Sequence, residues 1–351
     1  VEDRILNFRR AVIATGARAA ALPIAGLTET GYLTNETLFE LTELPPRLGV
    51  IGAGPIGCEM AQAFARFGSE VYLLESFSQI LGREDREAAS IVERALRRDG
   101  VQLVLNCWIR SVVGENGDKV LELEGGDEGR RITVDEILLG VGRTPNVEGL
   151  GLEKAGVEYD GSQGVIVNDY LQTSNPVIYA AGDICSPYKF THTADASARI
   201  VIQNALFLGR KKAGTLTIPW CTYTDPEIAH VGMYKKDAEE RGLKVDTFIR
   251  ELKEVDRAVL DGETDGFVKV HTEKGKDRIL GATIVACNAG NMISELTLAI
   301  VAGAGLGTVA GTIHPYPTQS EAIKQVGDAY NRTRLTPLVR KLFNRWLAWS
   351  R

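Results

Sequence analysis

Three glycines after an apolar run have the spacing of a dinucleotide-binding turn. Gly52, Gly54 and Gly57 form a Gly-x-Gly-x-x-Gly pattern directly after residues 48–51. The first glycine permits a tight turn, the second lets backbone approach a pyrophosphate, and the third lets the following helix pack closely on the strand. The free N–H groups at the start of that helix then bind the pyrophosphate. The residues assigned to this turn are Gly52, Gly54, Pro55, Ile56 and Gly57.

Glu75 predicts which dinucleotide binds. Residues 60–67 have helical apolar spacing, and residues 70–75 form the expected next strand, with Glu75 at its end. A carboxylate about 20 residues after the turn can accept both hydroxyls of an adenosine ribose and would repel a 2′-phosphate. We therefore expect NAD rather than NADP. An ordinary glycine turn is the weaker alternative, because the helix and second strand are both in place.

The composition excludes several classes of protein. The 351 residues carry a net charge of −6, which gives no basic field for nucleic acid. The five cysteines are scattered and form no Cys-x-x-Cys or Cys/His cluster, so we expect a reducing, cytoplasmic setting without disulfides and without a metal site. Residues 296–313 are uncharged but glycine-rich, which favours a buried helix running into a loop over a membrane span.

The order of expected elements is α/β followed by α+β. The sequence opens at Val1 with a strand-like segment, 1–10, and no targeting pattern, so we expect it to be part of a longer gene product. A turn is expected at Gly125 and Gly126. Strands are expected within 10–16, 48–51, 70–75, 102–105, 119–123, 135–146, 164–168, 177–183, 267–271 and 279–286. Helices are expected near 35–41, 60–67, 86–98, 194–208, 292–302 and 320–326.

Five ordered segments together resemble a known family. They are Ala14-Thr-Gly16, residues 52–59, Gly140-Val-Gly-Arg-Thr-Pro-Asn146, Ala181-Gly-Asp183 and residues 314–321. In this order they resemble the FAD-dependent pyridine nucleotide–disulfide oxidoreductases (class I), which include lipoamide dehydrogenase, glutathione reductase and mercuric reductase. The resemblance covers essentially the whole chain, and residues 255–267 and 314–321 are most similar to mercuric-reductase-type members.

The resemblance implies a fold and its division. The fold is α/β, with a Rossmann-like NAD domain inserted in a partial FAD domain, plus a C-terminal α+β dimerisation domain. The implied parts are an FAD-domain remnant and crossover at 1–45, the NAD domain at 46–145, the C-terminal part of the FAD domain at 146–215, the interface domain at 216–330 and a basic amphipathic tail at 331–351.

The resemblance also implies site residues beyond the glycine turn. Gly142 and Arg143 match the crossover beside the nicotinamide nucleotide, and Glu59 matches a carboxylate that pairs with a lysine near the flavin. The residues matching FAD contacts are Thr15, Gly16, Asp183 and Thr191. Taken singly, Asp183 could be a turn or N-cap residue, Arg143 a surface arginine and Glu59 an exposed helix residue.

The sequence departs from the family at its redox centre. These 351 residues hold no second dinucleotide fingerprint and no Cys-x-x-x-x-Cys pair, and the glycines at 303, 305 and 307 follow a helical segment rather than a strand. Taken by themselves, the residues are not expected to catalyse disulfide exchange.

Tyr316 marks a second departure. Disulfide-reducing members have a histidine directly before Pro-Thr and a glutamate five positions later, which together act as a base and its orienting carboxylate. Counting back from Glu321 places Tyr316 there, with His314 out of register. A phenol with a pKa near ~10 is a poor base for a thiol. Mercuric reductases also carry a tyrosine there, but they end in a cysteine pair that this sequence lacks, so a generic reductase is equally well supported.

The last segment carries a separate signal. Residues 331–351 contain six basic residues and no acid, and apolar residues recur at helical spacing. One interpretation, which the sequence favours, is a helix packed against its own dimer. The other is peripheral contact with an anionic membrane.

The leading hypothesis is a homodimeric oxidoreductase that passes hydride from NAD(P)H to FAD and on to a disulfide or metal ion. One alternative is a non-catalytic NAD-binding and dimerisation fragment, and another is an enzyme of the dihydrolipoamide dehydrogenase type. A plain NAD dehydrogenase is disfavoured, because no acid–base histidine follows a strand end beside a substrate pocket.

Overall fold

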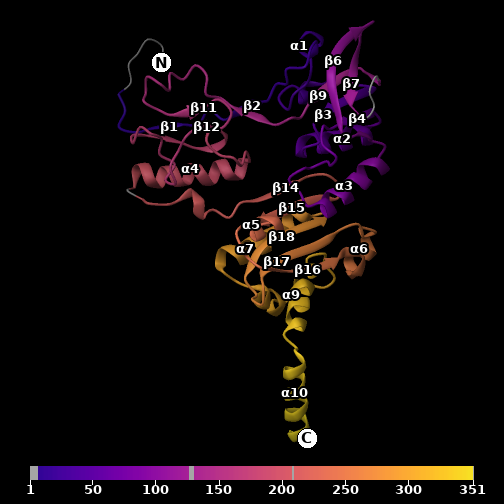
Figure 1. Cartoon of the computed structure of the whole chain (residues 1–351), viewed down its shortest axis with the longest axis vertical. Helices are drawn as coiled ribbons and strands as arrows, with labels where there is room; N and C mark the ends of the chain where they lie inside the picture. The colour runs from indigo at the N-terminus through magenta and orange to yellow at the C-terminus, as the bar shows by residue number, and fades with distance from the viewer. Residues whose placement is uncertain (1–6, 126–129, 208, 351) are drawn as a thin grey trace. The chain divides into compact units, whose positions relative to one another are not determined.

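The computed structural model describes residues 7–125, 130–207 and 209–350 (Figure 1). The chain forms two compact units. The first comprises residues 1–57, 72–76 and 106–216, and the second comprises residues 58–71, 77–105 and 217–351.

Buried parallel strands position the glycine turn in the first unit. Strand β3 (Arg47–Ile51) lies between β4 (Glu70–Leu74) and β9 (Glu136–Leu139), and it pairs with β9 in parallel. Leu48 and Val50 are fully buried. A parallel strand covered on both faces reads as a continuous apolar run, which is why residues 48–51 show no alternation. Three residues separate the end of β3 at Ile51 from the start of helix α2 (Pro55–Phe67).

The remaining strands of the first unit bring distant segments together. Strand β1 (Ala11–Ile13) pairs in parallel with β13 (Ile178–Ala180), and β2 (Ala17–Ala19) pairs antiparallel with β10 (Arg143–Pro145). Because β2 pairs with β10, the two crossover segments, residues 14–16 and 140–146, lie side by side. The other elements are α1 (Leu27–Thr30), β6 (Cys107–Glu115), β7 (Asp118–Gly125), β8 (Arg131–Val134), β11 (Tyr159–Asp160), β12 (Gly164–Val165) and α4 (Thr191–Leu206).

The second unit is built on a five-stranded antiparallel sheet of order β14-β15-β18-β17-β16. Its strands are β14 (Pro219–Thr222), β15 (Glu227–Gly232), β16 (Val245–Glu251), β17 (Phe267–Glu273) and β18 (Ile279–Ala286). Helices α7 (Ala289–Ala302) and α9 (Glu321–Thr333) pack on it and form one apolar core (Figure 1). The other elements are α3 (Arg86–Arg98), β5 (Gln102–Val104), α5 (Lys235–Glu240), α6 (Asp256–Asp261), α8 (Leu306–Gly311) and α10 (Pro337–Trp349).

Most expected elements are confirmed, and a few are shorter than expected. Residues 35–41 form only one 3₁₀ turn, Leu38–Glu40. The strand expected to reach Asp183 stops at Ala180, because Gly182 has φ 81° and turns the chain into a short 3₁₀ helix. The opening strand fails at residues 7–10, which are not in a strand, and residues 1–6 and Gly126 lie outside the described residues. No helix in the described part of the chain has the length and apolar character needed to cross a membrane.

Candidate functional site

The glycine turn has the geometry that a pyrophosphate site needs. Gly52 has φ 97°, and its N–H donates to the Leu74 carbonyl at 2.9 Å. A Cβ on Gly57 would lie 1.9 Å from the Gly52 carbonyl oxygen, so only glycine allows α2 to pack this closely. By contrast, a Cβ on Gly54 would meet its nearest neighbour, the Gly140 oxygen, at 3.9 Å. A Cβ on Gly54 would therefore make only an ordinary van der Waals contact with the protein, so the fold itself does not require glycine at the place where backbone would approach a ligand.

Glu75 lies directly beside this turn. Its Oε2 accepts a hydrogen bond from the Ala53 backbone N–H at 2.9 Å, and its Oε1 accepts one from the Ser76 hydroxyl at 3.1 Å. The side chain is half-buried. The structure thus brings the acid at the end of β4 to the glycine turn, which is the arrangement expected for recognition of an adenosine ribose.

The two crossovers are tied together through Asn146. Its backbone N–H donates to the Gly16 carbonyl at 3.0 Å, and its side-chain amide donates to the Thr15 carbonyl at 2.9 Å. The Thr15 hydroxyl in turn donates to the Asn146 carbonyl at 2.9 Å. Gly16 takes φ 70° at this point. These bonds fix Thr15 and Gly16, two of the expected FAD contacts, against the return crossover.

Arg143 and Asp183 form an ion pair that the sequence did not reveal. Arg143 Nη1 lies 2.8 Å from Asp183 Oδ2, and the Asp183 side chain is only 12% exposed. The Arg143 Nε is buried and has no hydrogen-bond partner among the described residues. Because an unpaired buried donor is costly, an acceptor on a bound cofactor fits here. Arg143, which is expected beside the nicotinamide, and Asp183, which is expected beside FAD, are therefore in direct contact.

Lys189 adds a second cation at this place. Its Nζ donates to the backbone carbonyls of Asp183 at 2.8 Å and Ser186 at 3.2 Å, and burial lowers its pKa. Thr191, the remaining expected FAD contact, is exposed as the first residue of the 16-residue helix α4. Lys189 belongs to none of the sequence motifs, so only its position six residues after Asp183 could have indicated that it lies at this site.

Glu59 lies in the second unit and binds backbone there. Its Oε1 accepts a hydrogen bond from the Tyr223 N–H at 2.8 Å, and burial raises the pKa of its carboxyl. The neighbouring Cys221 thiol also has a raised pKa, through burial and then through the carboxylate of Glu227. Cys221 is therefore a protonated thiol rather than a nucleophile. The lysine partner expected for Glu59 remains a prediction.

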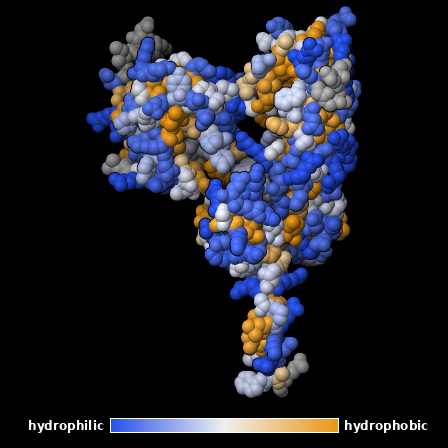
Figure 2. Space-filling view, viewed as in Figure 1, coloured by the Kyte–Doolittle hydropathy of each residue, from blue (hydrophilic) through white to orange (hydrophobic). Residues whose placement is uncertain are grey.

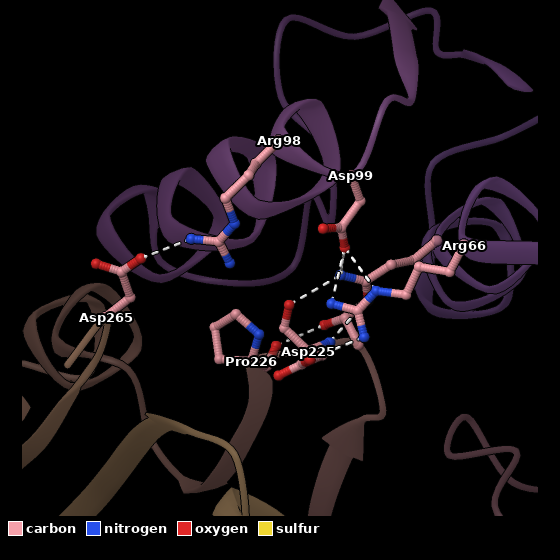
Figure 3. Close-up of polar contacts among 8 residues, drawn as sticks. Arg66, Arg98, Asp99, Asp225, Pro226 and Asp265 are labelled. Carbon is pink, nitrogen blue, oxygen red and sulfur yellow. Dashed lines mark hydrogen bonds and ion pairs between the residues drawn. The ribbon is translucent and has the colours of Figure 1, made fainter. Parts of the chain in front are cut away.

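Further along α2, a polar network holds the helix to the segment before β15 (Figure 3). The Gln62 amide nitrogen donates to Asp99 Oδ2 and to the Asp225 carbonyl, both at 2.8 Å, and its oxygen accepts from the Asp225 N–H at 2.7 Å. Arg66 pairs with both Asp99 and Asp225 at 2.8 Å. Glu59, Gln62 and Arg66 follow one face of the helix, so α2 is bonded along that face.

Tyr316 is 69% exposed, and its hydroxyl donates to Asp256 Oδ2 at 2.9 Å. This hydrogen bond raises the pKa of the phenol, so Tyr316 stays protonated near neutral pH. Glu321 is the first residue of α9. The structure thus gives Tyr316 a partner 60 residues away rather than Glu321, and the catalytic assignment of Tyr316 and Glu321 remains a prediction.

The histidines and cysteines have structural surroundings. His314 bonds Glu295 at 2.9 Å, His230 and His271 are buried, and His192 is exposed, as expected for structural or surface residues. All five cysteines are free thiols. No cluster of metal-binding side chains occurs within the described ranges.

Comparison with known proteins identifies the family. Residues 1–198 match the family model "Pyridine nucleotide-disulphide oxidoreductase", and residues 218–326 match its dimerisation domain. The chain is 36% identical to a mercuric reductase of Staphylococcus aureus over 92% of its own length and 59% of that protein. It is 35% identical to a dihydrolipoyl dehydrogenase of Thermus scotoductus over 92% of its length and 70% of that protein.

Solved structures show the same fold. The HOCl-induced flavoprotein disulfide reductase RclA from Escherichia coli superposes with a TM-score of 0.84 at 29% identity, over 91% of this chain and 73% of that one. The chain spans little more than half the length of the mercuric reductases that it matches. The matches to both domain models, in order along the chain, show that it belongs to the pyridine nucleotide–disulphide oxidoreductase family.

Proposed function

We propose that this protein serves a flavin-dependent oxidoreductase reaction, in which hydride passes from a reduced nicotinamide dinucleotide to FAD and on to a disulfide or metal-ion acceptor. Family membership supports binding of FAD and a pyridine nucleotide. The cofactors would supply the redox chemistry, and the residues of this chain would bind and orient them. No cysteine pair for the last step occurs in these 351 residues, so that step is not assigned to any of them.

The glycine turn is the observation that carries the proposal. Gly52 and Gly57 are required by the fold itself, because a Cβ on either would meet backbone at 2.8 Å or less. Gly54 is not required in this way, since a Cβ there would meet its nearest neighbour at 3.9 Å, yet it directly precedes the N-terminal end of α2. Backbone N–H groups and the positive end of a helix favour a pyrophosphate at such a place.

FAD would be held where the crossovers meet. We expect the Asp183 carboxylate to accept from a ribitol hydroxyl and the orphaned Nε of Arg143 to donate to the same cofactor, and the ion pair between the two residues supports this proposal. The N-terminal end of α4, at Thr191, has no side-chain cap bond, and the positive end of the helix dipole there would favour a flavin oxygen. Thr15 and Gly16 would line the same region through backbone.

Substituting Gly54 by alanine tests the nucleotide site. The added methyl group has room in the protein, so Gly54→Ala should unfold at the parent temperature but bind NADH at least about tenfold more weakly by calorimetry. Gly161→Ala is the matched control, since a Cβ there meets nothing within 4 Å. If Gly54→Ala binds NADH like the parent, the glycine turn is not the pyrophosphate site.

We further propose that Glu75 selects NAD over NADP. A carboxylate bonded to the Ala53 N–H lies at the turn, where it would repel a 2′-phosphate. The ratio of NADPH to NADH dissociation constants should therefore fall in Glu75→Gln by about tenfold or more. An unchanged ratio would remove Glu75 from cofactor selection.

A second candidate is a non-catalytic nucleotide-binding and dimerisation module, which the missing cysteine pair favours. Visible absorbance distinguishes the two. Purified protein that retains yellow flavin supports the oxidoreductase, whereas colourless protein that still binds NADH supports the module.

We also propose a homodimer, which the match of residues 218–326 supports. A monomer at micromolar concentration in sedimentation would count against it.

A further inference from the structure

Helix α10 lies beyond both segments that match the family. The dimerisation-domain match ends at residue 326, whereas α10 runs from Pro337 to Trp349. The helix has its own start signal, because the Thr336 hydroxyl caps the Val339 N–H at 3.3 Å and Pro337 follows at the first helical position. Helix α10 therefore has its own N-cap and lies outside both domains that match the family, so the family match does not account for it.

The side chains of α10 divide into two faces. One face is apolar at i, i+4 spacing and consists of Leu338, Val339, Leu342, Phe343, Trp346, Leu347 and Trp349. The opposite face carries Arg340, Lys341, Asn344 and Arg345. No residue of the helix is buried; Leu338 is 68% exposed and Trp349 is 84% exposed. Figure 2 shows apolar side chains gathered along one side of this helix, next to hydrophilic ones.

The charge on this segment is opposite to that of the whole chain. The protein has a net charge of −6, but residues 331–350 contain five cations and no acid. In the part of the chain that the structure describes, no carboxylate pairs with Arg340, Lys341 or Arg345. On α5, in contrast, the equally exposed Lys235 and Lys236 each pair with a glutamate one turn later. The cations of α10 are therefore available to an external anionic surface.

We propose that α10 docks in the surface of an anionic membrane, with its apolar face at the boundary of the acyl chains and its cations on the lipid headgroups. A helix of 13 residues is about 20 Å long, too short to span the hydrocarbon core but long enough to lie in its surface. Trp346 and Trp349 suit this depth, because indole rings favour the membrane–water interface. A pairing of α10 with a second copy would explain the apolar face but not an unpaired cationic face.

Vesicle sedimentation with the full chain tests the docking. Phosphatidylcholine vesicles with phosphatidylserine should pellet the protein, and vesicles of phosphatidylcholine alone should pellet at least about tenfold less. Arg340→Glu/Lys341→Glu should weaken binding to the anionic vesicles at least about 30-fold, and raised salt should weaken binding of the parent. The matched control Lys235→Glu/Lys236→Glu, which makes the same charge change on α5, should change binding less than twofold.

Three outcomes would overturn the docking. They are failure of the parent to pellet with anionic vesicles, equal pelleting on both lipids, or equal losses in the two charge-reversed variants. Leu342→Ser/Trp346→Ser should abolish pelleting without changing the sedimentation coefficient in the absence of lipid. A change from dimer to monomer in that variant would instead show that α10 contacts a second copy. NADH affinity should stay constant throughout, so the result is independent of the proposed reaction.

Discussion

The Arg143–Asp183 pair of the first unit keeps an unused hydrogen-bond donor, whereas the Lys269 and Glu84 clusters of the second unit are buried and paired. In the first unit, Gly54 has room for a Cβ, and Arg143 of the Arg143–Asp183 pair keeps an unused buried donor. In the second unit, Lys269 is 5% exposed and pairs with Asp85 at 2.5 Å and Glu87 at 3.0 Å.

Glu84 shows the same difference. Its carboxylate accepts from the Trp220 indole at 2.8 Å and from the Tyr234 hydroxyl at 2.5 Å, and burial raises the pKa of its carboxyl. The ring of Tyr234 stacks on His230 with centroids 3.7 Å apart. Such a satisfied cluster holds elements in place but offers nothing to a ligand. Unpaired buried atoms also occur in the second unit, for example at Arg250 and His271, so an unused donor marks the candidate site only together with the glycine turn and the paired crossovers.

The largest effect is expected for Gly57→Ala. The methyl group would lie 1.9 Å from the Gly52 oxygen, so the helix must move away from the strand. We expect a loss of about 3 kcal/mol in the free energy of unfolding, together with loss of NADH binding. Urea unfolding and calorimetry measure the two effects. Gly311→Ala, where a Cβ meets nothing within 4 Å, is the control. Parent-like stability in Gly57→Ala would show that the turn is not packed in this way.

In the second unit, Asp85→Asn should cost about 2 kcal/mol, because it leaves the buried Lys269 ammonium with only the largely exposed Glu87 as a partner. NADH binding should not change. The helix start should be unaffected, since Asp85 precedes α3 without a side-chain cap bond. Asp265→Asn removes the exposed pair with Arg98 and should change stability by less than about 0.5 kcal/mol in the same urea titration. Equal losses in the free energy of unfolding in the two variants would contradict the expectation that the buried ion pair contributes more to stability than the exposed one.

These contacts also separate what the sequence could predict from what it could not. The glycine turn, Glu75 and helix 86–98 were predictable, because spacing and periodicity act over short stretches of chain. The bonds of Glu84 to Trp220 and Tyr234 join residues 136 and 150 positions apart. A charged residue in a polar stretch looks solvated until the fold buries it. Tyr316 bonding Asp256 rather than Glu321 belongs to the same class.

Acid should destabilise the protein through its buried histidines. Burial lowers the pKa of His230 to about 3 and that of His271 to about 4, from 6.5. Between pH 4 and 6.5 the unfolded chain therefore binds more protons, and stability falls as the pH falls. The raised pKa of Glu84 acts in the opposite direction, since its contribution is lost as the pH rises above 4.5.

His271→Asn should therefore reduce the loss in the free energy of unfolding between pH 6.5 and 4.5 by about 1–2 kcal/mol, as measured by urea unfolding at each pH. A slope in His271→Asn that equals the parent's would mean that His271 is protonated in the folded state.

The smallest expected difference separates two neighbours on α2 (Figure 3). Gln62 is 4% exposed and makes three hydrogen bonds to Asp99 and Asp225, whereas the Arg66 side chain is 43% exposed although it carries the charge. Gln62→Ala removes the acceptor of the part-buried Asp225 N–H and should cost about 1–2 kcal/mol. Arg66→Ala should cost less than about 1 kcal/mol, because water screens the exposed pair. If urea unfolding reverses this order, charge rather than burial sets the strength of the network, and the contrast between the two units loses its physical basis.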